Sequence, residues 1–185
     1  MEPEDGFEAR LAQLLLADPT RMQILKAVEA LSVGSAFIAA GFLRNLVWDA
    51  LHAIHPPTPL NDVDVIYFDN TDPCPHAASD YQAQLATQLP NVRWQVKNQA
   101  VMHKRNGDAP YEGIVDAMQH WPEKETAVAV QLHQGSLTFV SGFGFESLFN
   151  GRLSWNPARA QHTFLHRVEQ KQWLSRWPKL QITMR

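Results

Sequence analysis

Apolar residues recur with a helical period in two runs near the start of the chain, over residues 7–17 and 20–31. Such a period gives each helix one apolar face that needs a partner in the core. Asp18 and Pro19 stand between the two runs and end the first helix. The pattern predicts a pair of helices packed onto the sheet that the following segments form.

The next apolar segments have the length and the flanking turn residues of strands. Residues 36–40 and 62–68 are two such segments, and a predicted helix over residues 42–52 separates them. A further helix over residues 79–89 precedes an alternating segment at 92–99, which we interpret as a third strand. We expect the three strands to be neighbours in one sheet.

Two more strands, over residues 126–132 and 137–140, flank Gln134 and Gly135, which form a hairpin turn. A brief helix follows at residues 146–149. Strands that alternate with helices and then end in a hairpin are typical of a mixed sheet with helices packed on it. The predicted class is therefore α/β, in the form of an α+β fold with a mixed sheet.

Length and composition fit a single domain with an ordinary apolar core. The chain has 185 residues, of which 45% are hydrophobic and 19% charged. We predict one domain over residues 1–185, with a helical N-terminal appendage at 1–33. The core sheet and its helices occupy residues 34–145, and a C-terminal extension occupies residues 146–185.

The formal net charge of −3 argues against a protein that coats a nucleic-acid duplex, because such proteins are normally basic. Basic residues cluster locally instead, over residues 97–105 and 152–185. These clusters are compatible with a local site for a nucleotide or an RNA end. The second cluster lies in an amphipathic segment whose apolar residues have helical spacing: Phe164, Val168, Trp173 and Trp177.

Cysteine content and the N-terminal residues indicate in which cellular compartment the protein is found. The single Cys74 excludes an internal disulfide and a multi-cysteine zinc site. Glu2, Glu4 and Asp5 are the opposite of the basic start of a signal peptide. The sequence also contains no apolar run of the roughly 20 residues that span a bilayer. We expect a cytoplasmic protein with no membrane partner.

The candidate chemistry lies around Gly41 and the strand that begins at Asp62. Asp62 and Asp64 are two residues apart in a strand, so their side chains share one face. Two such charges repel unless a cation lies between them, and hard oxygen ligands suit Mg²⁺. Gly41 precedes a helix whose first N–H groups can bind a phosphate. The alternative is a solvated pair of carboxylates and a simple tight turn.

Two short segments carry a resemblance to a known superfamily. Residues 41–45 (GFLRN) and 62–64 (DVD) resemble the G-x-x-R-[DN] … D-x-D pattern of polymerase-β-like nucleotidyltransferases, and most closely CCA-adding tRNA nucleotidyltransferases. A bacterial family of minimal nucleotidyltransferases is similar over residues 36–178. Further segments that carry this likeness are Trp48-Asp49, Pro59-Leu60-Asn61-Asp62, Tyr67-Phe68-Asp69, Val96-Lys97-Asn98-Gln99, Met102-His103, Trp121-Pro122-Glu123 and Phe143-Gly144.

The resemblance implies transfer of a nucleoside monophosphate from an NTP to an acceptor hydroxyl, with Mg²⁺ as cofactor. It implies that Asp62 and Asp64 are catalytic and bind the metal, and that the turn at Gly41 binds phosphates. For Arg44 two roles stay open, a clamp on the triphosphate or an ion-pair partner of the carboxylates. Asn45, a candidate residue of the nucleotide site, replaces an aspartate of the tRNA enzymes, and we expect it to order the local loop.

Enzymes of the superfamily usually carry a third carboxylate on the next core strand, and residues 92–99 contain none. Asn98 and Gln99 are the candidates there, because their amides can contact a metal, a base or a sugar. Glu123 is the first candidate for a catalytic acid from elsewhere, and Asp116 is the second. The missing acid leaves three interpretations: one-metal chemistry, a base from another element, or loss of activity.

Two rival functions therefore stand beside the transferase. One is a nucleotide-binding protein with weak or no catalysis, which the missing carboxylate favours. The other is an antitoxin-like interaction partner, by analogy with small members of the superfamily. For the transferase we expect an NTP substrate and an acceptor that is a small molecule, a protein or an RNA end.

Overall fold

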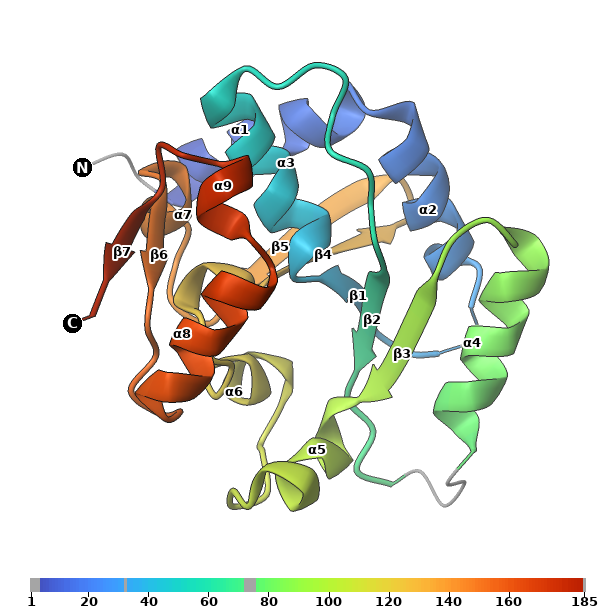
Figure 1. The fold of residues 1–185 in the computed structure, drawn as a ribbon. Helices are drawn as coiled ribbons and strands as arrows, with labels where there is room; N and C mark the ends of the chain where they lie inside the picture. The colour runs from blue at the N-terminus through green and yellow to red at the C-terminus, as the bar shows by residue number, and fades with distance from the viewer. Residues whose placement is uncertain (1–3, 32, 72–75, 185) are drawn as a thin grey trace.

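A five-stranded mixed sheet forms the centre of the computed structural model, which describes residues 4–31, 33–71 and 76–184 (Figure 1). Along the sheet the strands follow the order β3-β2-β1-β4-β5. Their bounds are β1 (Ala36–Ala39), β2 (Val63–Tyr67), β3 (Trp94–Asn98), β4 (Val128–His133) and β5 (Ser136–Ser141).

The three strands predicted as neighbours are confirmed as such, with β2 between the other two. β2 runs antiparallel to β1 and parallel to β3, and β1 also pairs antiparallel with β4. Helix α3 (Gly41–His52) connects β1 to β2, and β4 and β5 form the predicted hairpin around Gln134 and Gly135. In this register Asp64 lies between Ala39 on one side and Gln95 on the other.

One face of the sheet is covered by four helices and holds the main hydrophobic core. Val63 and Val65 of β2 belong to this core, together with Trp94 and Val96 of β3. The predicted N-terminal helix pair is confirmed, since residues of both helices pack into the same core. Helices that contribute include α1 (Glu4–Leu16), α2 (Pro19–Glu29), α3 and α4 (Ala77–Gln88), and residues of the C-terminal extension extend the same core.

The other face of the sheet is smaller and more open. Phe37, Ile66 and Met118 form a second hydrophobic cluster there with alanines of β1 and β4. Helix α6 (Ile114–Met118) covers this cluster, and α5 (Gln99–Asn106) follows directly from β3 (Figure 1). The strand period places Asp62 and Asp64 on this second face, beyond the cluster.

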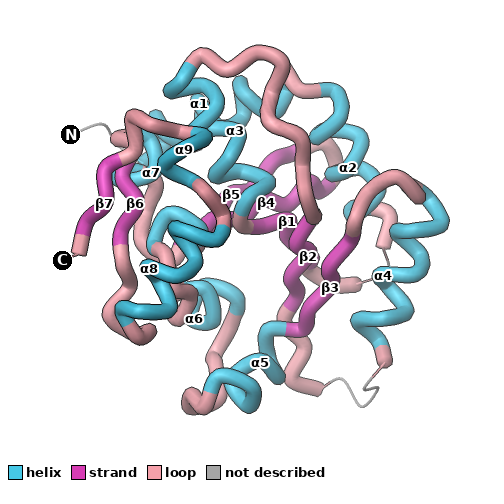
Figure 2. The backbone as a smooth tube through the Cα atoms, in the orientation of Figure 1, coloured by secondary structure: helices cyan, strands magenta, loops and turns pink. Residues whose placement is uncertain are grey.

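The C-terminal extension folds back onto α3. Trp48 of α3 contacts Trp173 and Trp177, with ring centroids 5.8 and 5.0 Å apart. Asp49 accepts a hydrogen bond from the indole N–H of Trp177 at 2.8 Å. Figure 2 shows β6 and β7 at the end of the molecule far from α4. The remaining elements are η1 (Lys124–Thr126), α7 (Glu146–Phe149), β6 (Arg152–Ser154), α8 (Gln161–Gln170), α9 (Trp173–Arg176) and β7 (Gln181–Thr183).

Two parts of the fold differ from the predictions. The third strand ends at Asn98, and the helix α5 that follows it was not predicted; the Asn98 side chain caps this helix by accepting from the Ala100 N–H. The parallel pair β6–β7 was missed because each strand has only three residues, too few to show a period. Cys74 lies outside the described residues. Among the described residues, no helix is both long and apolar enough to cross a bilayer.

The turn between β1 and α3 contains a strained residue. Ala40 has φ +58° and ψ −125°, a conformation that residues with a Cβ rarely adopt. Its N–H donates to the Val128 carbonyl at 3.0 Å, and its own carbonyl accepts from the Arg44 N–H at 3.0 Å. These two hydrogen bonds hold the turn in place and thereby position the first residues of α3.

We expect Ala40→Gly to raise the free energy of unfolding by about 1 kcal/mol. Relief of strain, about 1–3 kcal/mol, exceeds the added chain entropy of glycine, about 0.5–1 kcal/mol. The neighbouring Ala39→Gly has no strain to relieve and loses a buried methyl group, so it should destabilise the protein by more than about 1 kcal/mol. Urea unfolding compares the two variants, and equal losses would contradict the account of the turn.

Candidate active site

Two carboxylates at the start of β2 face a cavity of about 590 Å³, a volume typical of small-ligand sites. Asp62 directly precedes the strand and Asp64 is its second residue. Gly41 lines the same cavity. The structure therefore brings together the carboxylate pair and the glycine turn, as the sequence predicted.

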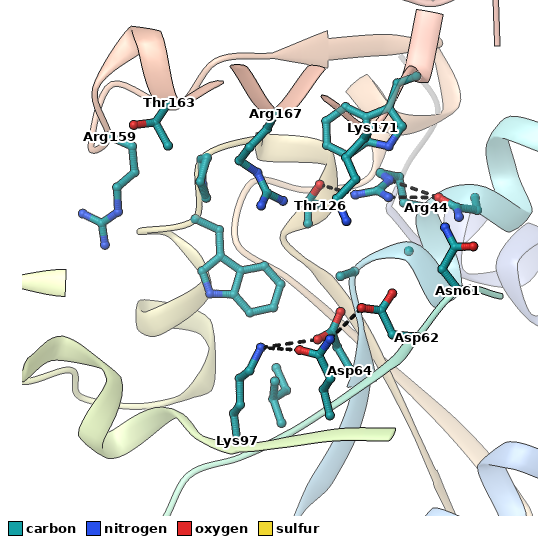
Figure 3. A pocket seen from close by; sticks show the side chains of 18 of the residues that line it. Arg44, Asn61, Asp62, Asp64, Lys97, Thr126, Arg159, Thr163, Arg167 and Lys171 are labelled. Carbon is teal, nitrogen blue, oxygen red and sulfur yellow. Dashed lines mark hydrogen bonds and ion pairs between the residues drawn. The ribbon is translucent and has the colours of Figure 1, made fainter. Parts of the chain in front are cut away.

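Strand β3 supplies the hydrogen-bond partners of the carboxylates. The Gln95 side-chain amide donates to Asp62 Oδ2 at 2.6 Å, and its carbonyl oxygen accepts from Lys97 Nζ at 2.9 Å. Lys97 Nζ also lies 3.6 Å from Asp64 Oδ1. A chain of side chains thus joins the two carboxylates through β3 (Figure 3). Gln95 and Lys97 were not predicted as partners of the carboxylates, because the register between β2 and β3 depends on contacts between segments that are far apart in the sequence.

The environment disfavours the charged form of Asp64. Burial raises the pKa of the Asp64 carboxyl above its ordinary value, the Lys97 ammonium opposes this shift, and the nearby Asp62 charge adds to it. A cation bound between the carboxylates would relieve both the burial cost and the repulsion. The pKa shift therefore agrees with a site that takes up positive charge.

Arg44 and Asn45 lie together over the first turn of α3. The Asn45 side-chain oxygen accepts from Arg44 Nε at 3.2 Å and from Nη2 at 3.0 Å. A Cβ at position 41 would lie 3.3 Å from Arg44 Nη2 and 3.4 Å from the Asn45 amide nitrogen. Gly41 therefore leaves room for this pair, and Asn45 orders the site by orienting Arg44.

The Arg44 guanidinium is buried, and the groups in direct contact with it are neutral. Its Nη1 donates to Thr126 Oγ1 at 2.6 Å, and its Cζ lies 4.9 Å from the centroid of the Trp48 ring and 4.5 Å from that of the Trp173 ring. Burial lowers the pKa of Arg44 to about 10, so the group is still charged at neutral pH. No ion pair within the described part of the chain involves Arg44. A buried cation of this kind is a suitable partner for an anionic ligand.

The cavity is strongly basic although the protein is acidic overall. Asp62 and Asp64 are the acidic residues that line it among those described, whereas the basic lining residues are Arg44 of α3 and members of both clusters noted in the sequence. Two of the arginines already have a carboxylate partner, since Arg159 pairs with Asp108 and Arg167 with Glu123. The basic residues are Arg44, Lys97, Arg105, Arg159, Arg167, Lys171 and Arg176.

One wall of the cavity comes from the C-terminal extension. Arg167 and Lys171 reach it from α8 and the turn after it, and Trp173 and Trp177 line it from α9. Figure 3 shows Arg167 pointing into the cavity on the side opposite Asp64. The amphipathic pattern of the tail predicted its helices but not their contribution to the site, which depends on packing against α3.

Glu123 does not lie where the sequence hypothesis placed it. Its side chain is fully buried and forms an ion pair with Arg167, with Arg167 Nε 2.5 Å from Glu123 Oε1. It is not among the residues that line the cavity of Asp62 and Asp64. Proximity in sequence to β3 suggested a catalytic acid, whereas the contacts show a structural partner that holds Arg167 in place.

Asn98 and Asp116 also have structural roles. Asn98 caps α5 and bonds to both the N–H and the carbonyl of Asp69. Asp116 accepts a hydrogen bond from the Glu112 N–H, and neither residue lines the cavity. Gln99 does line the cavity and is buried. Asn98 is therefore no longer a candidate for nucleotide binding, and Gln99 stays one.

The donor set fits a metal that takes part of its ligands from a substrate. No group of three or more His, Cys, Asp or Glu side chains that could hold a metal occurs among the described residues. Asp62 and Asp64 alone provide carboxylate oxygens on one face. Mg²⁺ is commonly bound by one or two carboxylates together with substrate phosphates, so this pair suits Mg²⁺.

Comparison with protein families shows to which family the chain belongs. A family model described as nucleotidyltransferase matches residues 26–182, which is most of the chain. The chain belongs to this nucleotidyltransferase family. The resemblance that segments 41–45 and 62–64 carry is thereby confirmed at the level of the family. A comparison with curated proteins gives no match.

Solved structures confirm the fold of this family member. An NMR structure described as a CCA-adding enzyme head domain aligns with a TM-score of 0.80 and 27% identity, covering 94% of this chain and 96% of that one. A CCA-adding enzyme with CTP aligns with a TM-score of 0.58 and 13% identity, covering 94% and 43%. The Thermotoga maritima CCA-adding enzyme with tRNA aligns with 0.60 and 15%, covering 94% and 42%. This nucleotidyltransferase corresponds to less than half the length of the last two chains.

We expect Glu123→Gln to destabilise the protein by about 3 kcal/mol. Removal of one partner of a buried ion pair costs about 3–5 kcal/mol, and the lower end applies because Arg167 is one-third exposed. Glu112→Gln, at an exposed position, is the matched control and should change stability by less than about 0.5 kcal/mol. Equal unfolding midpoints in urea for both variants would contradict the structural role.

We expect Asp64→Asn to stabilise the metal-free fold at pH 7. Because the folded-state pKa of Asp64 is raised, ionisation costs stability as the pH rises above the ordinary carboxyl value of 3.8. The neutral amide avoids this cost, so the gain should shrink as the pH is lowered toward that value. Urea unfolding in EDTA measures it, with the exposed Asp80→Asn as control. A gain that grows toward acid pH would refute the environment assigned to Asp64.

Proposed function

We propose that this chain is a Mg²⁺-dependent nucleotidyltransferase, which moves a nucleoside monophosphate from an NTP to an acceptor hydroxyl. One observation carries the proposal. The carboxylates of Asp62 and Asp64 share a cavity with Gly41 and with the buried guanidinium of Arg44. Metal-binding oxygens and phosphate-binding groups therefore face the same space.

Asp62 and Asp64 would hold Mg²⁺ through their carboxylate oxygens. Held there, Mg²⁺ would supply positive charge against the negative charge that develops on the triphosphate during transfer. Gln95 keeps Asp62 oriented through its 2.6 Å hydrogen bond, so that one oxygen of that carboxylate stays directed at β3. Asp62 Oδ1 and Asp64 Oδ2 are the oxygens available for the metal, since Asp64 Oδ1 faces the Lys97 ammonium.

The first turn of α3 and Arg44 would bind the triphosphate. The first N–H groups of a helix have no partner within it and carry the positive end of its dipole. Arg44 has five N–H donors, of which the bonds to Asn45 and Thr126 use three. Two donors are left for phosphate oxygens, and the triphosphate would supply the negative charge that this buried cation lacks. Of the two roles considered from sequence, we propose the clamp.

The relatives support an NTP as the substrate. A CCA-adding enzyme of the same fold has been solved with CTP, and another with tRNA. By analogy we propose an NTP in this cavity and an acceptor that is an RNA end, a small molecule or a protein. Lys171 and Arg167 lie on the opposite wall, where they would add positive charge near the phosphates.

In the proposed reaction the acceptor oxygen forms a bond to the α-phosphorus. The bond between that phosphorus and the bridging oxygen of the β-phosphate breaks, and pyrophosphate leaves with its electron pair. The hydroxyl proton passes to water, because no third carboxylate lines the cavity among the described residues. General-base help is worth roughly 10²–10⁴ in rate, so we expect slow turnover.

The same missing acid favours a second candidate function, nucleotide binding without turnover. The two functions share the binding site and differ only in chemistry. Incubation with Mg²⁺, each labelled NTP and candidate acceptors distinguishes them. Transfer of label with release of pyrophosphate supports the transferase, whereas tight binding without release supports the binding protein.

We expect Asp64→Asn to abolish the Mg²⁺ dependence of NTP binding, and Arg44→Gln to weaken binding roughly 10–100-fold. The second figure corresponds to about 1.5–3 kcal/mol for hydrogen bonds to a charged group. Isothermal titration with a non-hydrolysable NTP measures both affinities, with and without Mg²⁺. Asp80→Asn, on α4, is the control and should bind like the native protein. Native affinity in both site variants would show that the nucleotide does not bind in this cavity.

A further inference from the structure

Lys97 occupies an unusual place in the site. Its ammonium lies 3.6 Å from Asp64 Oδ1 and donates to Gln95 Oε1 at 2.9 Å. The side chain is 38% exposed and lines the cavity, so the charge stands at the edge of the carboxylate pair and in reach of a ligand. The position is fixed by two partners on the protein itself.

The sheet register explains why Lys97 is there. β3 runs parallel to β2, with Gln95 beside Asp64 and Lys97 beside Ile66. The strand period directs Gln95 and Lys97 to the same face as the carboxylates. This is the strand on which a third carboxylate was expected, and a cation stands there instead.

Lys97 makes the site less favourable for a second divalent ion. Asp62, Asp64 and Lys97 together carry one net negative charge, whereas a carboxylate in place of Lys97 would give three. The triphosphate adds negative charge in either case, so the protein's own share of the site is two charges more positive with lysine at position 97. A second ion would also have to approach the ammonium closely without any added carboxylate to bind it.

We propose that Lys97 supplies the positive charge that a second metal ion would bring, so that the site binds one divalent cation with each nucleotide. This inference rests on the proposed function, because it concerns the same carboxylates and the same triphosphate. Lys97 would stabilise charge on the nucleotide from a fixed position on β3. It differs from a metal ion in that Gln95 and Asp64 keep it in the site before any ligand binds.

Counting bound Mn²⁺ tests the inference without reference to activity. Mn²⁺ is titrated by electron paramagnetic resonance in the presence of a non-hydrolysable NTP analogue. We expect one protein-dependent Mn²⁺ per nucleotide in the native protein and in Lys97→Arg, which conserves the charge. Lys97→Glu puts a third carboxylate on β3 and removes the ammonium, so it should bind two. Lys104→Glu makes the same charge change at an exposed position of α5 and should bind one.

Two protein-dependent ions in the native protein, or one in Lys97→Glu, would overturn the inference while leaving the proposed function intact. Absence of any protein-dependent Mn²⁺ in the native protein would overturn both. The fold of each variant is checked by circular dichroism. If Lys97→Glu does not fold, Lys97→Asp carries the same charge on a shorter side chain and takes its place, with the same two outcomes.

Discussion

Repulsion between two carboxylates on one face of a strand is the constraint on which the site depends. Asp62 and Asp64 are brought together by the geometry of β2, and burial raises the pKa of Asp64. Groups on neighbouring elements offset this negative charge. β3 contributes Gln95 and Lys97 as partners, and the helix after Gly41 directs its positive end toward the same cavity. The pair is costly for the free protein and favourable for one that binds a cation.

A second constraint joins the C-terminal extension to the site. Trp177 bonds to Asp49 and Arg167 pairs with the buried Glu123, so the tail is held against α3 and the segment before β4. The wall that results concentrates positive charge in a cavity of a protein whose formal net charge is −3. Residues far apart in the sequence thus produce a local field suited to a polyanion. Stability of the fold and composition of the site depend on the same buried contacts.

Periodicity and local turn chemistry predicted the fold and half of the site. A strand period of two is enough to place Asp62 and Asp64 on one face, and the order of elements is enough to predict a mixed sheet. Contacts between distant segments could not be read in this way. Lys97 was seen only as part of a basic cluster, because its partner depends on the register of β3 against β2. The role of Glu123 was predicted from its closeness in sequence to β3, whereas the arginine that pairs with it, the partly exposed Arg167, comes from a helix later in the chain.

The most direct test is a crystal structure of the protein soaked with Mn²⁺ and a non-hydrolysable NTP, with the metal located by its anomalous signal. The account predicts a Mn²⁺ about 2.0–2.3 Å from oxygens of both Asp62 and Asp64 and of the triphosphate. It also predicts that the phosphates contact the first turn of α3 and Arg44. A nucleotide bound elsewhere, or a Mn²⁺ that contacts neither carboxylate, would contradict it.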